Sequence, residues 1–297
     1  MGLTRREALR LCGVGTGAAV LWSQWAPLAA AAPPAARFKV GVTDWNLKLA
    51  NKPEAVELAK RLGFDGVQIS LGVGADRLPL ADPGLQQKYL SESRRLGLPL
   101  ASVCLEVLHK NVLKSDPLGR RWVAEAIPIA RALGVNVILL PFFGKGALET
   151  RAEMDYVGDV LRELAPEAEK AGVVLGLEDT ISARDNVSIM ERTKSKAVRT
   201  YYDVGNSTKA GFNVVEEIGW LGGERICEMH LKDNPGFMGK GSIDFPAVVD
   251  ALADIGFRAW AELETDAPTG SIEKDMATNL AYIRGVMDAR NAKAAGT

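Results

Sequence analysis

One unit recurs along most of the chain, and it limits the folds that the sequence can adopt. Each copy has an amphipathic helical pattern, a glycine and then an apolar or β-branched run, as in RLGFDGVQI and ALGVNVILL. A glycine at this place caps the helix in the left-handed conformation and turns the chain into a strand. The repeat therefore predicts strands that alternate with helices. The glycines concerned are Gly63, Gly97, Gly134, Gly172 and Gly256.

The spacing of these glycines leads us to expect eight strands. The first intervals are 34, 37 and 38 residues, and the last, 84 residues, has room for two more units. The clearest helix covers 151–170, where Thr150 and Glu153 can form a capping box. The expected strands are 40–43, 66–70, 101–105, 135–141, 173–178, 199–203, 227–231 and 258–264.

Eight strand-helix units favour a closed sheet. We therefore predict a single-domain α/β fold, the (β/α)₈ TIM barrel, over residues 37–290, with a frayed tail from Ala289. A chain of 297 residues that loses residues 1–32 has about the length that such a barrel needs. A doubly wound open sheet is the alternative, but no G-x-G-x-x-G or P-loop motif follows an expected strand.

Residues 1–32 have the features of an export signal. Arg5 and Arg6 precede an apolar stretch at 13–22, and 29–32 offers an A-x-A-type cleavage site. This segment resembles a twin-arginine signal, so we expect an exported, periplasmic protein without a membrane anchor after cleavage. A retained anchor is the alternative, although the apolar stretch is short for a membrane span.

The net charge bears on possible binding partners, and the cysteine content bears on disulfide bonding. A formal net charge of -1 gives no electrostatic reason to expect nucleic acid. Cys104 and Cys227 lie in apolar, strand-like segments, so buried free thiols are expected instead of a disulfide. The sequence leaves the oligomeric state open, with a homo-oligomer as one option.

Four consecutive expected strands end near side chains that can bind a metal ion. They are Glu178 in LEDT, Asp203 in YYDVGN, His230 in HLKD and Glu264 in AELETD. The carboxyl ends of parallel barrel strands meet at one face, so these donors should converge. Three carboxylates and an imidazole suit Mn²⁺, Mg²⁺ or Co²⁺ better than thiolate-rich sets do. A divalent ion would also offset the repulsion between buried carboxylates.

Each of these side chains also has a plainer interpretation. Glu178 could belong to a helix cap, His230 could be a hydrogen-bonded core histidine, and Asp203 could be a turn residue. Glu264 competes with Glu262, which lies two residues earlier on the same strand face. Their shared position at successive strand ends favours the metal site.

From about residue 38 to about residue 289 the chain resembles the xylose-isomerase-like barrel superfamily, specifically its sugar phosphate isomerase/epimerase group. The resemblance rests on the LEDT, YYDVGN and HLKD motifs, on G-K-G-S-I-D-F at 239–245 and on GFRAWAELE. The chain departs from the common pattern at Asn206, where family members usually carry a histidine.

The resemblance implies one bound divalent metal ion, often Mn²⁺, with two glutamates acting on the substrate as acid and base. The implied ligands are Glu178, Asp203, His230 and Glu264, and the implied acid and base are Glu178 and Glu264. Further candidates for substrate contacts near the same barrel face are Trp45, Glu106, His109, Lys232 and Lys240. For these five, surface loops and solvated lysines are the plainer interpretation.

The implied activity is that of a metal-dependent sugar isomerase or epimerase acting on a small sugar or keto-sugar. It would remove a proton next to a carbonyl through a metal-stabilised enediolate. A lyase or hydrolase of 3-keto-glycosides and a non-catalytic sugar-binding barrel are the alternatives. A three-metal DNA-repair endonuclease of the same superfamily needs several histidines, and this chain has only His109 and His230.

Overall fold

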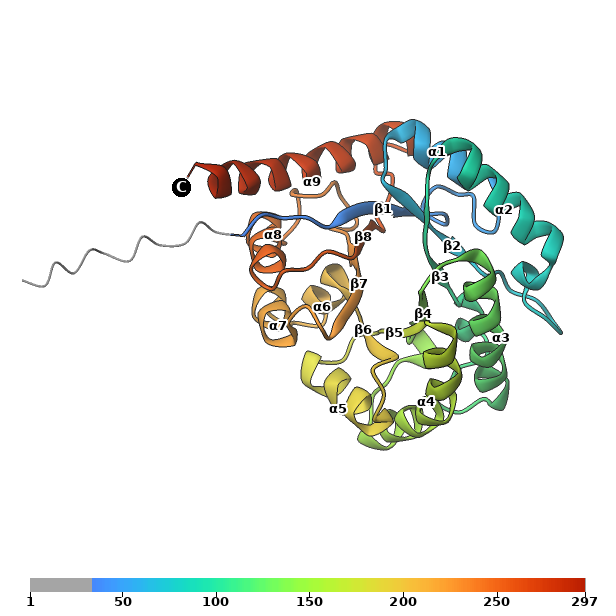
Figure 1. The fold of residues 1–297 in the computed structure, drawn as a ribbon. Coiled ribbons are helices and arrows are strands. Elements are labelled where there is room, and N and C mark those ends of the chain that lie inside the picture. Colours follow the sequence, from blue (N-terminus) through green and yellow to red (C-terminus); the bar gives the residue numbers. More distant parts are fainter. Residues whose placement is uncertain (1–33, 297) are drawn as a thin grey trace, which may run out of the picture. The chain divides into compact units, whose positions relative to one another are not determined.

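The computed structural model describes residues 34–296, so the expected export signal lies outside the described residues. Within this range, eight parallel strands close into a barrel in chain order, as predicted (Figure 1). The strands are β1 Lys39–Thr43, β2 Gly66–Ser70, β3 Leu100–Cys104, β4 Val137–Pro141, β5 Val174–Glu178, β6 Val198–Asp203, β7 Ile226–Leu231 and β8 Trp260–Leu263.

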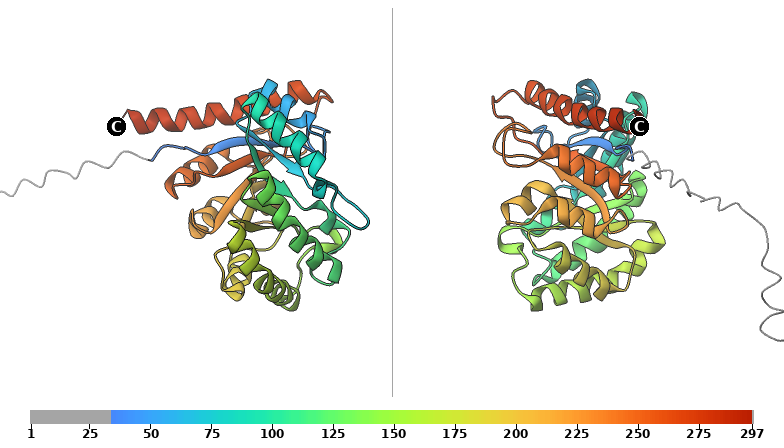
Figure 2. Two further views of the ribbon diagram at one scale, coloured as in Figure 1. Left: turned by 45° about the vertical axis from the view of Figure 1, so that its right-hand side comes forward. Right: turned by 90° about the vertical axis from the view of Figure 1, so that its left-hand side faces the viewer.

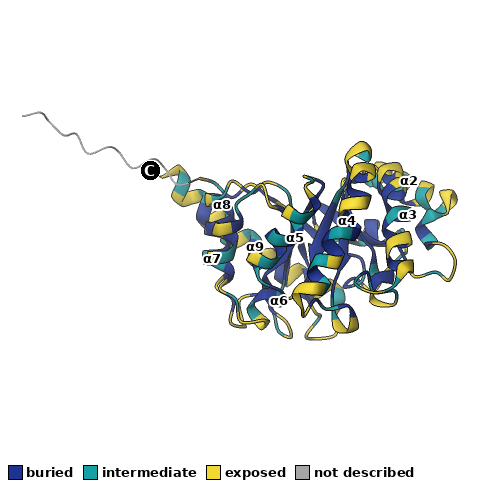
Figure 3. Ribbon diagram, turned by 90° about the horizontal axis from the view of Figure 1, so that it is seen from below, coloured by how far each residue is buried: buried dark blue, intermediate teal, exposed yellow. Residues whose placement is uncertain are grey.

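Helices surround the barrel, with their inner faces buried and their outer faces exposed (Figures 2 and 3). The helices are α1 Glu54–Leu62, α2 Pro83–Leu96, α3 Pro117–Leu133, α4 Arg151–Ala171, α5 Ala183–Thr193, α6 Val204–Lys209, α7 Val214–Leu221, α8 Phe245–Asp254 and α9 Ile272–Ala295. Short 3₁₀ turns are η1 Pro79–Ala81, η2 Glu106–His109 and η3 Gly144–Gly146.

The repeated glycines adopt the left-handed conformation that their position predicted. All five have φ between 60° and 89°, in the left-handed region. At the end of α4, the N–H of Gly172 donates to the carbonyls of Ala168 and Glu169. The predicted capping box of Thr150 and Glu153 opens the same helix. Hydrogen bonds to neighbouring residues thus close both ends of α4.

Three expected strands are shorter in the structure, β5 by one residue, β4 by two and β8 by three. β4 begins at Val137 and not at 135, because the N–H of Val135 still donates to Ala130 at the end of α3. β8 ends at Leu263, although the N–H of Glu264 donates to the carbonyl of Leu231 at 3.2 Å. Glu264 thus lies just beyond its strand and is still held by β7.

Helix α9 continues to Ala295, so the described residues from Ala289 to Ala295 are helical, which corrects the expectation of a frayed tail there. Arg290 is 8% exposed and donates to the carbonyl of Pro34 at 3.0 Å. It also pairs with Asp254 of α8 at 2.6 Å, so α9 is tied to the barrel close to its end. Among the described helices, none is both long and apolar enough to cross a membrane.

The cysteines agree with the sequence prediction. Cys104 and Cys227 are buried free thiols that pack with Val137, Leu139 and Tyr201. Burial raises the pKa of the Cys104 thiol well above its ordinary value. Both side chains therefore act as small apolar groups.

Gly66 begins β2 where there is no space for a side chain. A Cβ atom there would lie 2.5 Å from the ring of Trp260. We expect Gly66→Ala to lower the free energy of unfolding by about 1–3 kcal/mol, because the strand or the ring must move. Urea denaturation followed by circular dichroism measures the change.

Gly219→Ala in α7 is the matched control. None of the described residues outside its own helical turn lies within 4 Å of a Cβ atom there, so the helix should gain up to about 1 kcal/mol. Equal stability of the two variants would contradict the close packing at Gly66.

Candidate metal centre and active site

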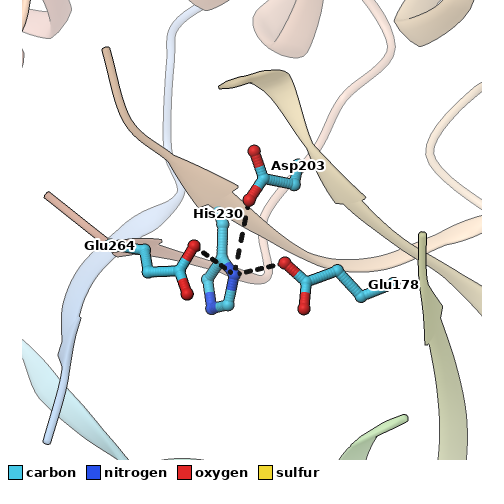
Figure 4. Close-up of side chains that lie close together, drawn as sticks. All are labelled: Glu178, Asp203, His230 and Glu264. Carbon is cyan, nitrogen blue, oxygen red and sulfur yellow. Dashed lines mark hydrogen bonds and ion pairs between the residues drawn. The ribbon is translucent and has the colours of Figure 1, made fainter. Parts of the chain in front are cut away.

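The four side chains singled out in the sequence lie together at the carboxyl end of the barrel (Figure 4). One ligand atom from each lies within 4.8 Å of the others. The parallel register explains this, because Asp203 pairs with His230, and His230 pairs with Glu262, two residues before Glu264. Glu178 ends the next strand along, β5.

One nitrogen of His230 faces all three carboxylates. Its Nδ1 lies 2.8 Å from Glu178 Oε1, 3.5 Å from Glu264 Oε2 and 3.7 Å from Asp203 Oδ2. His230 is fully buried, and Glu178 and Asp203 are each 3% exposed. Carboxylates this close in a buried place repel one another unless a cation lies among them. Three oxygen donors and one nitrogen fit a single divalent ion such as Mn²⁺, Mg²⁺ or Co²⁺.

The pKa values of these groups reflect the same crowding. Burial alone would lower the pKa of His230, but Glu264 and Glu178 raise it well above its ordinary value. Burial raises the pKa of Glu178 to about 7, against the lowering effect of His230. Burial would also raise the pKa of Asp203, but Lys232, 2.6 Å away, lowers it below its ordinary value. A proton on Nδ1 and a metal ion need the same place, so metal binding releases protons.

A chain of hydrogen bonds sets the orientation of the imidazole. Tyr201 donates its hydroxyl hydrogen to Glu262 at 2.7 Å, so its oxygen accepts from Gln68 Nε2 at 3.0 Å. Gln68 Nε2 also donates to Ser102 at 2.9 Å, which assigns the amide nitrogen. The amide oxygen of Gln68 therefore faces His230 Nε2 at 2.8 Å, and Nε2 carries the hydrogen. Nδ1 is left as the nitrogen that could bind a metal ion.

These contacts bear on the plainer interpretations of Glu178, Asp203 and Glu264. α5 is capped by Ser182 and not by Glu178. Asp203 caps a helix and also belongs to the cluster. Its Oδ1 accepts from the N–H of Asn206 at the start of α6, while its Oδ2 faces His230. Of the two competing glutamates, Glu264 belongs to the cluster and Glu262 lies beneath it, bound to Tyr201.

A cavity of about 350 Å³ opens beside the cluster. Of the side chains singled out in the sequence, Glu178 and Glu264 line it, whereas Asp203 and His230 do not. The predicted substrate contacts that line it are Trp45, Glu106, His109 and Lys232. The remaining lining residues are Ala50, Ser70, Cys104, Pro141, Phe143 and Asn206.

The lining side chains are held in different ways. Trp45 Nε1 donates to Glu264 Oε1 at 3.0 Å, and Lys232 bonds to the other oxygen of the same carboxylate. Glu106 Oε1 accepts from the N–H of Gly72 at 2.8 Å, and burial raises the Glu106 pKa to about 7. Burial lowers the pKa of His109, which favours the neutral ring.

Lys240 does not reach the site, contrary to the expected substrate contact. It is exposed and does not line the cavity. The cause is the loop after β7, which folds back on itself because Asp233 accepts from the N–H groups of Gly239 and Gly241.

Gln68 and Tyr201 were missed by the sequence interpretation. A glutamine inside the otherwise apolar strand GVQIS is a signal for a functional polar group, because buried polar side chains need partners. Tyr201 lies two residues before Asp203, as Glu262 does before Glu264, and this spacing places each pair on one strand face. Asn206, at the position where the sequence departs from its family, donates to Glu178 within 3.5 Å.

Comparison with known proteins agrees with this geometry. A family model described as a xylose isomerase-like TIM barrel matches residues 56–286. The 2-epi-5-epi-valiolone 7-phosphate 2-epimerase of Actinoplanes sp. is 28% identical over 203 residues, which cover 66% of this chain and 73% of that protein. The L-ribulose-5-phosphate 3-epimerase UlaE of Escherichia coli is 27% identical over 265 residues, 81% of this chain and 90% of that protein.

Solved structures show the same fold. A structure of L-ribulose 3-epimerase superimposes with a TM-score of 0.72 at 19% identity, covering 86% of this chain and 97% of that chain.

Breaking the hydrogen bonds beneath His230 should weaken metal binding. We expect Tyr201→Phe to raise the Kd for Mn²⁺ by about 10- to 100-fold, because Gln68 is then free to turn and His230 loses its fixed orientation. Isothermal titration calorimetry on metal-free protein measures the Kd.

Tyr202→Phe is the matched control for this experiment. Its hydroxyl donates to Glu217 of α7 at 2.8 Å, outside the barrel, so its loss should leave the Kd unchanged. The same Kd in both variants would refute the orienting function of Tyr201.

Proposed function

The chain belongs to the xylose isomerase-like TIM barrel family, and we propose that it is a divalent-metal-dependent sugar epimerase. The observation that carries this proposal is the position of two glutamates. Glu178 and Glu264 reach the cavity from either side of His230 (Figure 4). Two carboxylates on opposite sides of a substrate carbon can take a proton from one face and return one to the other.

The division of work among the four side chains follows from what lines the cavity. Asp203 and His230 lie behind the lining, so we assign them to metal binding alone. Glu178 and Glu264 both line the cavity and can also contact a substrate, so we assign them acid and base functions in addition. Trp45 and Lys232 hold one oxygen each of Glu264, which keeps its carboxylate directed at the site.

We propose Mn²⁺ as the ion. An imidazole nitrogen beside three carboxylates suits Mn²⁺ better than Mg²⁺, which prefers oxygen ligands and retains water. When bound, such an ion supplies the positive charge that stabilises a carbonyl oxygen while the neighbouring carbon loses its proton. Without the ion, burial raises the pKa of Glu178 to about 7, and a bound cation would lower it because positive charge favours the carboxylate.

The relatives support the same class of reaction. The two relatives are named as epimerases, one of L-ribulose 5-phosphate and one of 2-epi-5-epi-valiolone 7-phosphate. Both names describe a change of configuration in a small polyhydroxylated substrate, which the paired glutamates can perform.

Solvent exchange tests the proposed chemistry. We expect the metal-loaded protein in D₂O to place deuterium on the carbon next to the carbonyl of a ketose such as L-ribulose, as followed by NMR. Glu178→Gln and Glu264→Gln should each lower epimerisation by about 100- to 10,000-fold, because each removes a proton-transfer group. Metal content, measured on the same samples, separates lost chemistry from lost metal.

Glu167→Gln, at an exposed position in α4, is the matched control and should leave the rate unchanged. Release of the aglycone from a 3-keto-glycoside would identify a lyase instead. Absence of exchange with any ketose, together with unchanged sugar affinity in the double glutamine variant, would identify a sugar-binding barrel.

We also propose that residues 1–32 direct export through the twin-arginine route and that the mature chain works in the periplasm. The proposal is supported by the Arg5 and Arg6 pair, the apolar stretch at 13–22 and the small residues at 29–32. An enzyme exported by this route folds first, so it can acquire its metal in the cytoplasm.

Replacing both Arg5 and Arg6 by lysine keeps the charge and should retain the protein in the cytoplasm, because the route recognises the arginine pair. Arg10→Lys is the control and should be exported normally. Cell fractionation with immunoblotting measures the distribution, and equal export of both variants would contradict the proposal.

A further inference from the structure

The loop after β7 has the composition of an anion-binding loop, but its backbone donors are already occupied. In TIM barrels, the loops after the last two strands and a nearby helix N-terminus often hold a phosphate group. Here the N–H groups of Gly239 and Gly241 donate to Asp233 Oδ2 at 3.1 and 2.8 Å. Asp233 is 5% exposed, and a Cβ atom on Gly241 would lie 2.0 Å from its Oδ1. The carboxylate thus takes the place of an external anion.

The neighbouring donors are occupied in the same manner. The N-terminus of α8 is capped by Asp244, which accepts from the N–H of Ala247 at 3.1 Å. In the loop after β8, buried Asp275 accepts from both the N–H and the hydroxyl of Thr269 at 2.7 Å. A phosphate at either place would have to displace a carboxylate and would meet its negative charge.

The cavity offers no free positive charge either. Among the described residues that line it, Lys232 is the sole lysine or arginine, and its Nζ contacts Asp203 and Glu264. A divalent ion and Lys232 together balance the three ligand carboxylates. Burial lowers the pKa of His109, which favours its neutral form. Lys240 is not among the residues that line the cavity.

The part of the lining outside the metal cluster is mostly uncharged. It includes Ala50, Cys104, Pro141 and Phe143, and the ring of His109 lies 6.2 Å from that of Phe143. The apolar side chains can contact the carbon-bound hydrogens of a sugar, the His109 ring can bond a hydroxyl, and none of these groups offers positive charge to a dianion.

From this charge distribution we infer that the substrate is a neutral, unphosphorylated keto-sugar and that Asp233 closes the loop after β7 to phosphate. The inference rests on the proposed epimerase function and narrows its substrate class. Asp233 acts through the loop and does not touch the reacting atoms.

Matched ligand pairs test the inference on the metal-loaded protein. The pairs are L-ribulose with L-ribulose 5-phosphate, and D-fructose with D-fructose 6-phosphate. We expect calorimetry to show that each phosphate ester binds at least about 10-fold more weakly than its neutral partner, because its charge finds no cation. Added salt should narrow the difference by screening the repulsion. Inorganic phosphate should not compete with the neutral sugar.

Asp233→Ala supplies the converse test. It frees two N–H groups and removes one carboxylate, so inorganic phosphate should bind at least about 10-fold more tightly than to the unaltered protein. Asp266→Ala, an exposed aspartate in the loop after β8, is the matched control and should not change phosphate binding. The ligand pairs on the unaltered protein decide the question even if Asp233→Ala fails to fold.

The outcomes separate this inference from the proposed function. Equal or tighter binding of the phosphate esters would overturn the inference, and so would failure of both neutral sugars to bind. Tighter binding of a neutral ketose without deuterium exchange would support the substrate class while refuting the epimerase chemistry.

Discussion

Three carboxylates directed at one imidazole nitrogen are the constraint on which the rest of the structure depends. Glu178, Asp203 and Glu264 come from separate segments, and the parallel pairing of β5 to β8 brings one oxygen of each within 4.8 Å of the others and of His230. Such a cluster is unfavourable unless positive charge is present. Lys232 supplies part of that charge, and a divalent ion would supply the rest.

The barrel interior below this cluster contains a second layer of polar side chains, which includes Tyr201 and Glu262. Side chains two residues apart share a face, so Tyr201 lies under Asp203 and Glu262 under Glu264. Gly176 leaves space for this layer, since a Cβ atom there would lie 3.1 Å from Tyr201 Cβ. The buried polar groups cost stability, which their hydrogen bonds offset, and in return they hold the imidazole with Nδ1 toward the carboxylates.

Charge balance also connects the candidate metal centre with the proposed neutral substrate. Lys232 already contacts two of the candidate ligand carboxylates, which is one reason for the proposal that it does not bind a substrate anion. Asp233, the next residue, turns away from the site and satisfies the backbone of the glycine-rich loop. Two adjacent residues at the end of β7 thus have different partners. Lys232 contacts Asp203 and Glu264 of the candidate metal centre, and Asp233 binds the backbone of the loop after β7.

Local periodicity in the sequence was enough to predict the fold and to select four candidate site residues that the structure places together. The features that allowed this depend on neighbours along the chain. They are the helical spacing, the capping glycines and the candidate ligands at successive strand ends, namely Glu178, Asp203, His230 and Glu264. These features predict a closed barrel and its metal ligands, because parallel strand ends must meet at one face.

Contacts between distant segments were decided only by the tertiary structure. The hydrogen bonds from Gln68 through Tyr201 to Glu262 join β2, β6 and β8, which are not neighbours in the sheet. Lys240 is turned away by its loop, and α9 continues through Arg290 because distant partners hold it. Local sequence patterns do not show which residues make these contacts, since the contacts depend on strand register across the barrel, whereas the periodic features depend on neighbours along the chain.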